Sequence, residues 1–214
     1  MTIDLVRQLE KLEEQPIPHQ VVLALLKDYS NPNEKIRQLI NRQLLQPVRR
    51  GLYVAGPQLG NRRPEPMLLA NHIAGPSYVT AETALSFHGL IPERVYMMVS
   101  ATPGKSRSFD TKVGMFQYHQ LRLPYYSFGI LSVQLREKQF VMIASPVKAI
   151  FDRVIFTPYL RLRSTVQALH LLVDDWRMEE DMLRKLDVVQ AREWLNDAPK
   201  SNSLDFIIQA IRQL

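Results

Sequence analysis

Hydrophobic residues in the first part of the chain repeat at helical spacing. Leu5, Leu9 and Leu12 fall on one face, which predicts a first helix from about Thr2 to Glu14. A second helix is predicted after Pro18, because a first-turn proline is followed by hydrophobic positions on a single face. Those positions are Val22, Leu25, Leu26 and Tyr29.

A third helix and a β hairpin are expected next. Asn31, Pro32 and Asn33 form a turn and cap cluster. The hydrophobic positions of the helix that follows are Ile36, Leu39, Ile40 and Leu44, and Pro47 is expected to end the helical run. Strand-forming residues then flank a basic turn, which reads Val48-Arg49-Arg50-Gly51-Leu52-Tyr53-Val54. Three helices followed by such a hairpin predict an N-terminal winged helix-turn-helix.

A linker separates this unit from the rest of the chain. The stretch from Gly56 to Pro66 is rich in turn residues and has no hydrophobic period, so we place the domain boundary near Arg63. Residues 1–63 are expected to form the winged helix-turn-helix with its linker, and residues 64–214 a second domain.

The second domain is predicted to be α+β with a helical C-terminal region. Short helices are expected over 67–73 and from a Thr80 cap through Phe87. Ser145 and Pro146 open a further helix, and the chain is expected to be helical from Leu160 onward. The hydrophobic pattern between these helices predicts strands over Val95–Ala101, Gly114–Leu123, Gly129–Leu135 and Gln139–Ile143.

The third helix presents a polar face opposite its hydrophobic one. Arginine, glutamine and asparagine can each form paired hydrogen bonds to base edges in the major groove, and lysine can contact phosphates. The hairpin adds two guanidinium groups. The predicted DNA-binding residues are Lys35, Arg37, Gln38, Asn41, Arg42, Arg49 and Arg50.

The charge distribution supports this interpretation. Residues 31–63 contain seven basic residues and one acidic residue, a net +6 that equals the net charge of the whole 214-residue chain. Such clustering is typical of binding to a phosphate backbone. Residues 161–214 contain eight basic and nine acidic residues, so that end is expected to avoid DNA. A basic interaction module that never meets DNA is the alternative.

The remaining composition excludes several classes of site. The chain has no cysteine, which excludes disulfides, thiolate zinc sites and a cysteine nucleophile. Its five histidines are scattered, so neither a metal nor another cofactor is predicted. No stretch of about 18 hydrophobic residues and no signal-peptide pattern is present, and a cytoplasmic location is therefore expected.

No enzymatic activity is predicted. Thr80 is interpreted as a helix cap, His88 as a helix-end residue, and Glu93 as a loop residue rather than as a catalytic set. Lys105, Arg107 and Lys112 are assigned to a solvated loop after Thr102, which lacks the glycine spacing of a P-loop; a second basic contact to nucleic acid is the alternative.

Three segments together resemble one family. They are the basic hairpin Arg49–Val54, the stretch Tyr-Val-Thr-Ala-Glu-Thr-Ala-Leu-Ser-Phe-His-Gly-Leu-Ile-Pro-Glu (78–93), and Ala-Ser-Pro-Val-Lys-Ala-Ile-Phe-Asp (144–152). In this order they resemble the AbiEi-type antitoxins of type IV toxin-antitoxin systems, and the resemblance covers most of the chain. It implies a winged helix that binds inverted repeats in promoter DNA, and a second domain that counters a nucleotidyltransferase-like toxin involved in abortive infection.

The sequence and this resemblance lead to one predicted function. We expect a DNA-binding transcriptional autorepressor and antitoxin whose partners are promoter DNA and the cognate toxin. Two alternatives stay open: a stand-alone winged-helix transcriptional regulator whose second domain senses a ligand or dimerises, and an enzyme acting on nucleic acid with the winged helix as its docking module.

Overall fold

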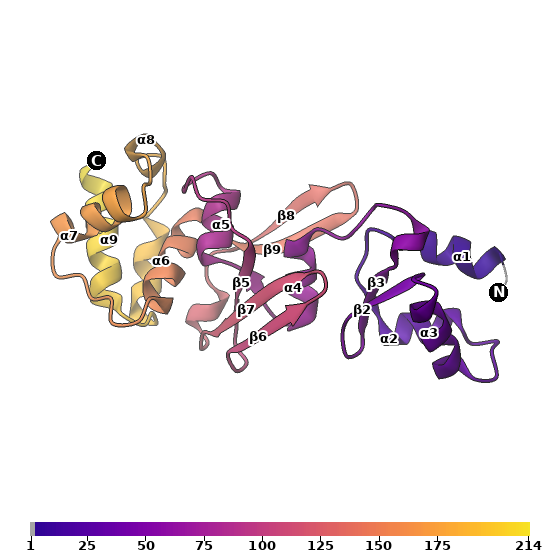
Figure 1. Cartoon of the computed structure of the whole chain (residues 1–214). Coiled ribbons are helices and arrows are strands. Elements are labelled where there is room, and N and C mark those ends of the chain that lie inside the picture. Colours follow the sequence, from indigo (N-terminus) through magenta and orange to yellow (C-terminus); the bar gives the residue numbers. More distant parts are fainter. Residues whose placement is uncertain (1–2) are drawn as a thin grey trace.

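The computed structural model describes residues 3–214 and has three parts that follow one another in chain order along one line (Figure 1). A small unit of helices and short strands lies at the N-terminal end. A six-stranded sheet with flanking helices occupies the middle, and a group of helices forms the C-terminal end. The chain is therefore α+β, as the sequence predicts.

The N-terminal unit combines three helices with a small antiparallel sheet. Its helices are α1 (Ile3–Glu10), α2 (His19–Leu25) and α3 (Pro32–Asn41). Its strands pair in the order β1-β3-β2, and they are β1 (Ile17–Pro18), β2 (Leu45–Arg49) and β3 (Leu52–Ala55). The Asn31 side chain caps α3 by accepting a hydrogen bond from the Glu34 backbone N–H at 3.2 Å, as predicted.

Two helix ends differ from the prediction. The first helix ends at Glu10 instead of Glu14, and its predicted start at Thr2 lies outside the described residues. The third helix ends at Asn41, so Leu44 lies beyond it and Pro47 sits within β2. A strand accepts this proline because β2 is an edge strand, where a missing backbone N–H costs no sheet hydrogen bond.

The middle part is a mixed sheet in the order β6-β7-β5-β4-β9-β8. Strands β5 and β7 pair in parallel, as do β4 and β9, and the other neighbours are antiparallel. The strands are β4 (Tyr78–Val79), β5 (Met97–Thr102), β6 (Arg107–Thr111), β7 (Gly114–Gln120), β8 (Ile130–Arg136) and β9 (Gln139–Ala144). The helices of this part are α4 (Pro66–Ile73), α5 (Ala81–Phe87) and α6 (Pro146–Phe156), and a short 3₁₀ turn η2 (Tyr125–Ser127) precedes β8.

The four predicted strands of the second domain are present, and two more occur. Strand β6 was assigned to a loop; its side chains are mostly exposed and polar, so an edge strand of this kind carries no hydrophobic alternation. Strand β4 has only two residues, too few to show a period. Ser145 caps α6 through its Oγ, which accepts from the Lys148 backbone N–H at 3.3 Å, as expected.

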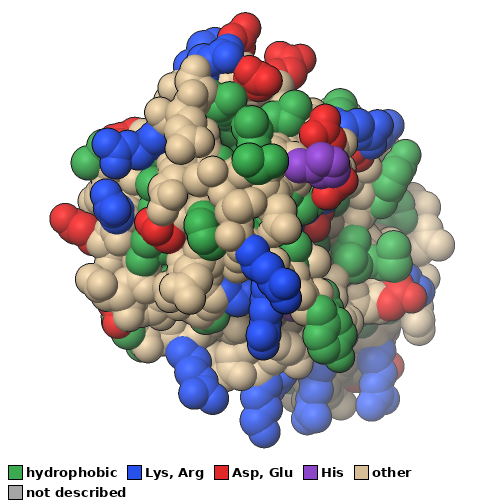
Figure 2. All heavy atoms as spheres, turned by 90° about the vertical axis from the view of Figure 1, so that its left-hand side faces the viewer, with side chains coloured by type: hydrophobic (Ala, Val, Ile, Leu, Met, Phe, Trp, Pro, Cys, Tyr) green, Lys and Arg blue, Asp and Glu red, His purple; other side chains and the backbone are tan. Residues whose placement is uncertain are grey.

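Short helical segments make up the C-terminal part. They are α7 (Thr165–His170), the π-helical turn η3 (Leu171–Asp175), α8 (Glu180–Leu183), the 3₁₀ helix η4 (Gln190–Asn196) and α9 (Ser201–Gln213). Figure 2 looks onto this end of the molecule and shows Lys and Arg side chains in the middle of the face and in a row along its lower edge, besides acidic groups. The surface seen from this end thus carries charges of both signs.

Two hydrophobic cores stabilise the chain. The smaller is built by α1, α2, α3, the 3₁₀ turn η1 (Pro57–Leu59) and one residue from each N-terminal strand, and the larger joins the sheet to the helices that follow it. Val48, Leu52 and Val54 of the β2–β3 hairpin belong to the larger core. The hairpin therefore packs against the second part of the chain instead of standing free.

Candidate functional site: a cavity at the junction

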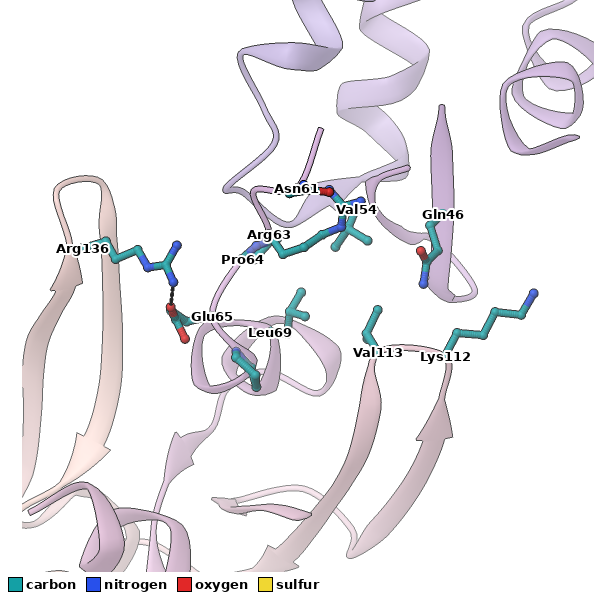
Figure 3. A pocket seen from close by; sticks show the side chains of 11 residues that line it. Gln46, Val54, Asn61, Arg63, Pro64, Glu65, Leu69, Lys112, Val113 and Arg136 are labelled. Carbon is teal, nitrogen blue, oxygen red and sulfur yellow. Dashed lines mark ion pairs between the residues drawn. The ribbon is translucent and has the colours of Figure 1, made fainter. Parts of the chain in front are cut away.

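A cavity of about 420 Å³ lies where the N-terminal unit meets the sheet. Its residues come from the β2–β3 hairpin, the linker, the start of α4, the β6–β7 turn and the end of β8 (Figure 3). This volume lies within the range of about 300–1,000 Å³ that is typical of small-molecule sites. The junction cavity is the candidate site because it joins segments that are far apart in the sequence.

Its walls combine hydrophobic and amide side chains. The hydrophobic surface is supplied by Val54, Pro64, Pro66, Leu69 and Val113. Gln46 of β2 and Asn61 of the linker add amide groups. An amide can donate and accept hydrogen bonds at once, so a flat ring with both kinds of group on its edge suits such a site.

The charge in the junction cavity is positive. Arg136 pairs with Glu65 (Figure 3) and lies 3.6 Å from the carboxylate of Glu14, so this part is neutralised internally. Lys112 and Arg63 also line the cavity, and among the described residues neither has an acidic partner within ion-pair distance. Two cations are therefore available to an anionic ligand.

A buried glutamine lies directly behind this wall. Gln139 is fully buried, and its Oε1 accepts a hydrogen bond from the backbone N–H of Glu65 at 2.8 Å. Its Nε2 has no hydrogen-bond partner in the described part of the chain. A buried donor without a partner costs free energy.

The predicted DNA-binding residues lie in two places. Arg37, Gln38, Asn41 and Arg42 are exposed on or directly after α3, and Lys35 is half-buried with its Nζ 5.0 Å from the ring centroid of Tyr29. The guanidinium of Arg37 also lies 3.4 Å from the carboxylate of Glu34. None of these side chains lines the junction cavity.

The two hairpin arginines point to different surroundings. The guanidinium of Arg49 lies 5.9 Å from the ring centroid of Phe109 on β6, so it contacts the second part of the chain. Arg49 and Arg50 are both exposed, but Arg50 lies in the turn beside Gly51, which adopts a φ of +82°. No local pattern predicts this difference, because adjacent arginines in a turn are equivalent in sequence.

A buried ionic network is the strongest electrostatic feature outside the cavity. Lys148 and Asp152 of α6 are both fully buried and their charged groups lie 3.1 Å apart. The hydroxyls of Tyr78, Thr80 and Tyr125 donate to the Asp152 carboxylate at 2.9, 2.8 and 3.0 Å. The two long segments that carry the family resemblance thus meet at this network, and sequence reasoning missed it.

Burial changes the acid–base properties of these groups. Desolvation lowers the pKa of the Lys148 amine, and the nearby Asp152 carboxylate opposes that shift. Desolvation and Asp152 both raise the pKa of the Tyr125 hydroxyl. All the groups are enclosed and mutually hydrogen-bonded, which indicates a structural role.

The residues assigned to helix ends differ in part from their predicted roles. Thr80 precedes α5, but its side chain makes no cap hydrogen bond, because the hydroxyl donates to Asp152 instead. His88 does end α5, and its Nε2 lies 2.8 Å from the carbonyl oxygen of Ala144. Glu93 pairs with Arg177, which helps to lower the pKa of its carboxyl after the larger effect of a backbone hydrogen bond.

The described residues contain neither a cluster of metal ligands nor a helix able to span a membrane. No group of three or more histidine, cysteine, aspartate or glutamate side chains in residues 3–214 is arranged to hold a metal ion. No helix in that range is long and hydrophobic enough to cross a membrane.

Known proteins resemble this chain both in fold and in part of the sequence. The fold is similar to the crystal structure of the RV2827C protein from Mycobacterium tuberculosis, with a TM-score of 0.62 and 12% identity over 97% of this chain and 75% of that one. At this identity the likeness concerns the fold alone. No family model matches the chain, so the resemblance to the AbiEi-type antitoxins stays a prediction.

The sequence similarity is to a probable GTP-binding protein, EngB, from Petrotoga mobilis. The two sequences are 31% identical over 99 residues, which is 46% of this chain. The matched region covers 41% of the length of that relative.

This match contradicts the predicted function. The curated relative is named for GTP binding, and it is neither an antitoxin nor a DNA-binding regulator. We therefore correct the prediction of a transcriptional autorepressor and antitoxin, together with its stand-alone regulator alternative. The expectation that the chain is not an enzyme is only partly supported, because GTP-binding proteins include enzymes. The predicted DNA and toxin partners stay untested. What the comparison shows is a similarity to a GTP-binding protein over 46% of this chain.

Proposed function

We propose that the chain binds a guanine nucleotide in the junction cavity. The observation that carries the proposal is the combination, in one cavity of about 420 Å³, of hydrophobic walls, two amide side chains and two cations without acidic partners among the described residues. The similarity to a GTP-binding protein supports the choice of nucleotide.

Each part of the nucleotide has a matching group in the cavity. Hydrophobic side chains such as Val54 and Val113 suit the faces of a purine ring, and the amides of Gln46 and Asn61 suit the donors and acceptors on its edge. Lys112 and Arg63 suit the phosphates, because hydrogen bonds between ionised partners are about twice as strong as neutral ones.

The proposal concerns binding and assigns no hydrolysis. In P-loop proteins a glycine-rich loop joins a strand to a helix, whose N-terminus binds the phosphates. Here Gly104, Lys105 and Ser106 lie between the strands β5 and β6, and Val99 stands where the first glycine of that motif is required. A nucleotide in the junction cavity would therefore not be bound by a glycine-rich loop at the N-terminus of a helix.

Replacing Lys112 tests the proposal. Titration with a fluorescent GTP analogue, followed by anisotropy, should show saturable binding that unlabelled GTP reverses. Lys112→Ala should weaken binding by about tenfold to a hundredfold, since a charged hydrogen bond is worth about 1.5–3 kcal/mol. Lys27→Ala removes an equally exposed lysine outside the cavity and should have no effect.

Two results would contradict this proposal. Absence of saturable binding at high protein concentration would exclude a guanine nucleotide as the ligand. Equal losses in the Lys112→Ala and Lys27→Ala variants would show that any binding reflects general charge and not the cavity.

We also propose that the N-terminal unit is a winged helix-turn-helix domain whose boundary lies near Arg63. The close succession of α2 and α3, the β2–β3 hairpin after them and the smaller core, whose buried residues all lie between Leu5 and Leu59, support this division. Residues 60–65 contain neither helix nor strand. Brief trypsin digestion should therefore cut first after Arg62, as identified by mass spectrometry, because the bond after Arg63 precedes Pro64 and resists trypsin. Earlier cleavage after Lys105 would contradict the proposed boundary.

A further inference from the structure

A second, smaller cavity lies at the other end of β2. It has a volume of about 190 Å³ and is lined by Arg49, Lys105 and Arg107 together with Ala74, Gly75, Thr102 and Gly104. It shares no lining residue with the junction cavity. Its size falls below the range of about 300–1,000 Å³ for whole small-molecule ligands, so it suits a single small group.

The charged residues around this cavity are all basic. Arg49 comes from the N-terminal unit, whereas Lys105 and Arg107 come from the sheet. In the described part of the chain none of the three is paired with a carboxylate, and no acidic residue lines the cavity. Like charges held together repel one another, so the arrangement favours a bound anion.

Hydrogen bonds fix the loop that carries two of these cations. The hydroxyl of Thr102 donates to the carbonyl oxygen of Pro76 at 2.9 Å and accepts from the backbone N–H of Gly104 at 3.2 Å. At the other end, the backbone N–H of Gln120 donates to the Ser106 hydroxyl at 2.9 Å. The loop around Lys105 is therefore held before any ligand arrives, which reduces the ordering cost of binding.

Arg49 is also held in place. Its guanidinium lies 5.9 Å from the ring centroid of Phe109, within the range of a cation–π interaction. This contact brings a cation of the N-terminal unit to the edge strand β6, which begins with Arg107. An anion between these arginines would contact both parts of the chain at once.

We propose that this smaller cavity is a phosphate-binding site that links the β2–β3 hairpin to the sheet. A tetrahedral oxyanion offers several acceptor oxygens to cations that arrive from different directions, and arginine is especially suited to phosphate. The site is independent of the proposed nucleotide function, because the two cavities share no residue. Its ligand is either free phosphate or the phosphate group of a small phosphate monoester.

Calorimetric titration with inorganic phosphate at constant ionic strength tests the proposal. The wild-type chain should show one saturable site, and phosphate should raise the unfolding temperature because it links two parts of the fold. Arg49→Ala and Arg107→Ala should each weaken binding at least tenfold. Arg50→Ala removes the adjacent, exposed arginine that does not line the cavity and should leave binding unchanged.

The remaining measurements separate the possible outcomes. Glycerol 3-phosphate binding more tightly than inorganic phosphate would identify a monoester as the ligand, and the reverse order would identify free phosphate. Lys27→Ala, which removes an exposed lysine outside both cavities, should retain full phosphate binding. No saturable site for either ligand, or an equal loss in Arg50→Ala and Arg107→Ala, would overturn the inference.

Discussion

Replacing Asp152 with alanine should destabilise the chain by about 3–5 kcal/mol, because the substitution leaves the Lys148 amine buried without its counter-charge. The hydroxyls of Tyr78, Thr80 and Tyr125 would lose their shared acceptor at the same time. For a chain of this size, the expected fall in unfolding temperature is about 10 °C. Urea and thermal unfolding monitored by circular dichroism would measure both quantities.

Two further variants make this test specific. Arg184→Ala removes exposed ion pairs with Glu180 and Asp181, and it should cost less than about 1 kcal/mol. The double variant Lys148→Met with Asp152→Leu replaces both charges with hydrophobic groups, so it should recover much of the stability. If Asp152→Ala were no more destabilising than Arg184→Ala, the buried network would not be a major contributor to stability.

Replacing Gly129 with alanine should also be strongly destabilising. This glycine has a φ of +61°, and an added Cβ would lie 2.6 Å from the Trp194 ring and 2.9 Å from the Cβ of Lys148. A left-handed conformation costs a non-glycine residue about 1–2 kcal/mol, and overpacking adds about 1–3 kcal/mol. The free energy of unfolding, from urea denaturation, should therefore fall by about 3 kcal/mol.

Gly89 offers a matched control for this substitution. It has a φ of +71°, but a Cβ added there would meet no atom within 4 Å. Gly89→Ala should therefore show only the backbone cost, about 1 kcal/mol. Equal effects at Gly89 and Gly129 would mean that the close approach of Trp194 and Lys148 contributes nothing.

The helices could be predicted from the sequence better than the strands. Buried residues such as Ile36 and Leu39, or Ile150 and Val154, recur at helical spacing and give a clear signal. Strand β6 has no such hydrophobic repeat, because it lies at an edge of the sheet and its side chains are mostly exposed. A hydrophobic period arises where one face of a helix or strand is buried, so it does not predict a strand whose two faces are both largely exposed.

The candidate sites could not be predicted from the sequence. Lys112 was seen as one basic residue near a loop, and nothing in the sequence placed it beside Gln46 and Arg63. Arg49 and Arg50 were treated as equivalent, but packing of the hairpin on the sheet directs Arg49 toward Phe109. Both sites depend on contacts between distant segments, which local patterns do not encode.

The order of strands in the sheet also has a consequence for synthesis on the ribosome. The central strand β4 pairs with β5 on one side and with β9 on the other, and Tyr78 and Asp152 lie 74 positions apart. Until α6 has emerged, Tyr78 and Thr80 lack the carboxylate that accepts their hydrogen bonds. At about 5–20 residues per second, synthesis of the 74 positions from Tyr78 to Asp152 takes several seconds. During that time the N-terminal core, complete by Leu59, is available as a folded neighbour for the unfinished sheet.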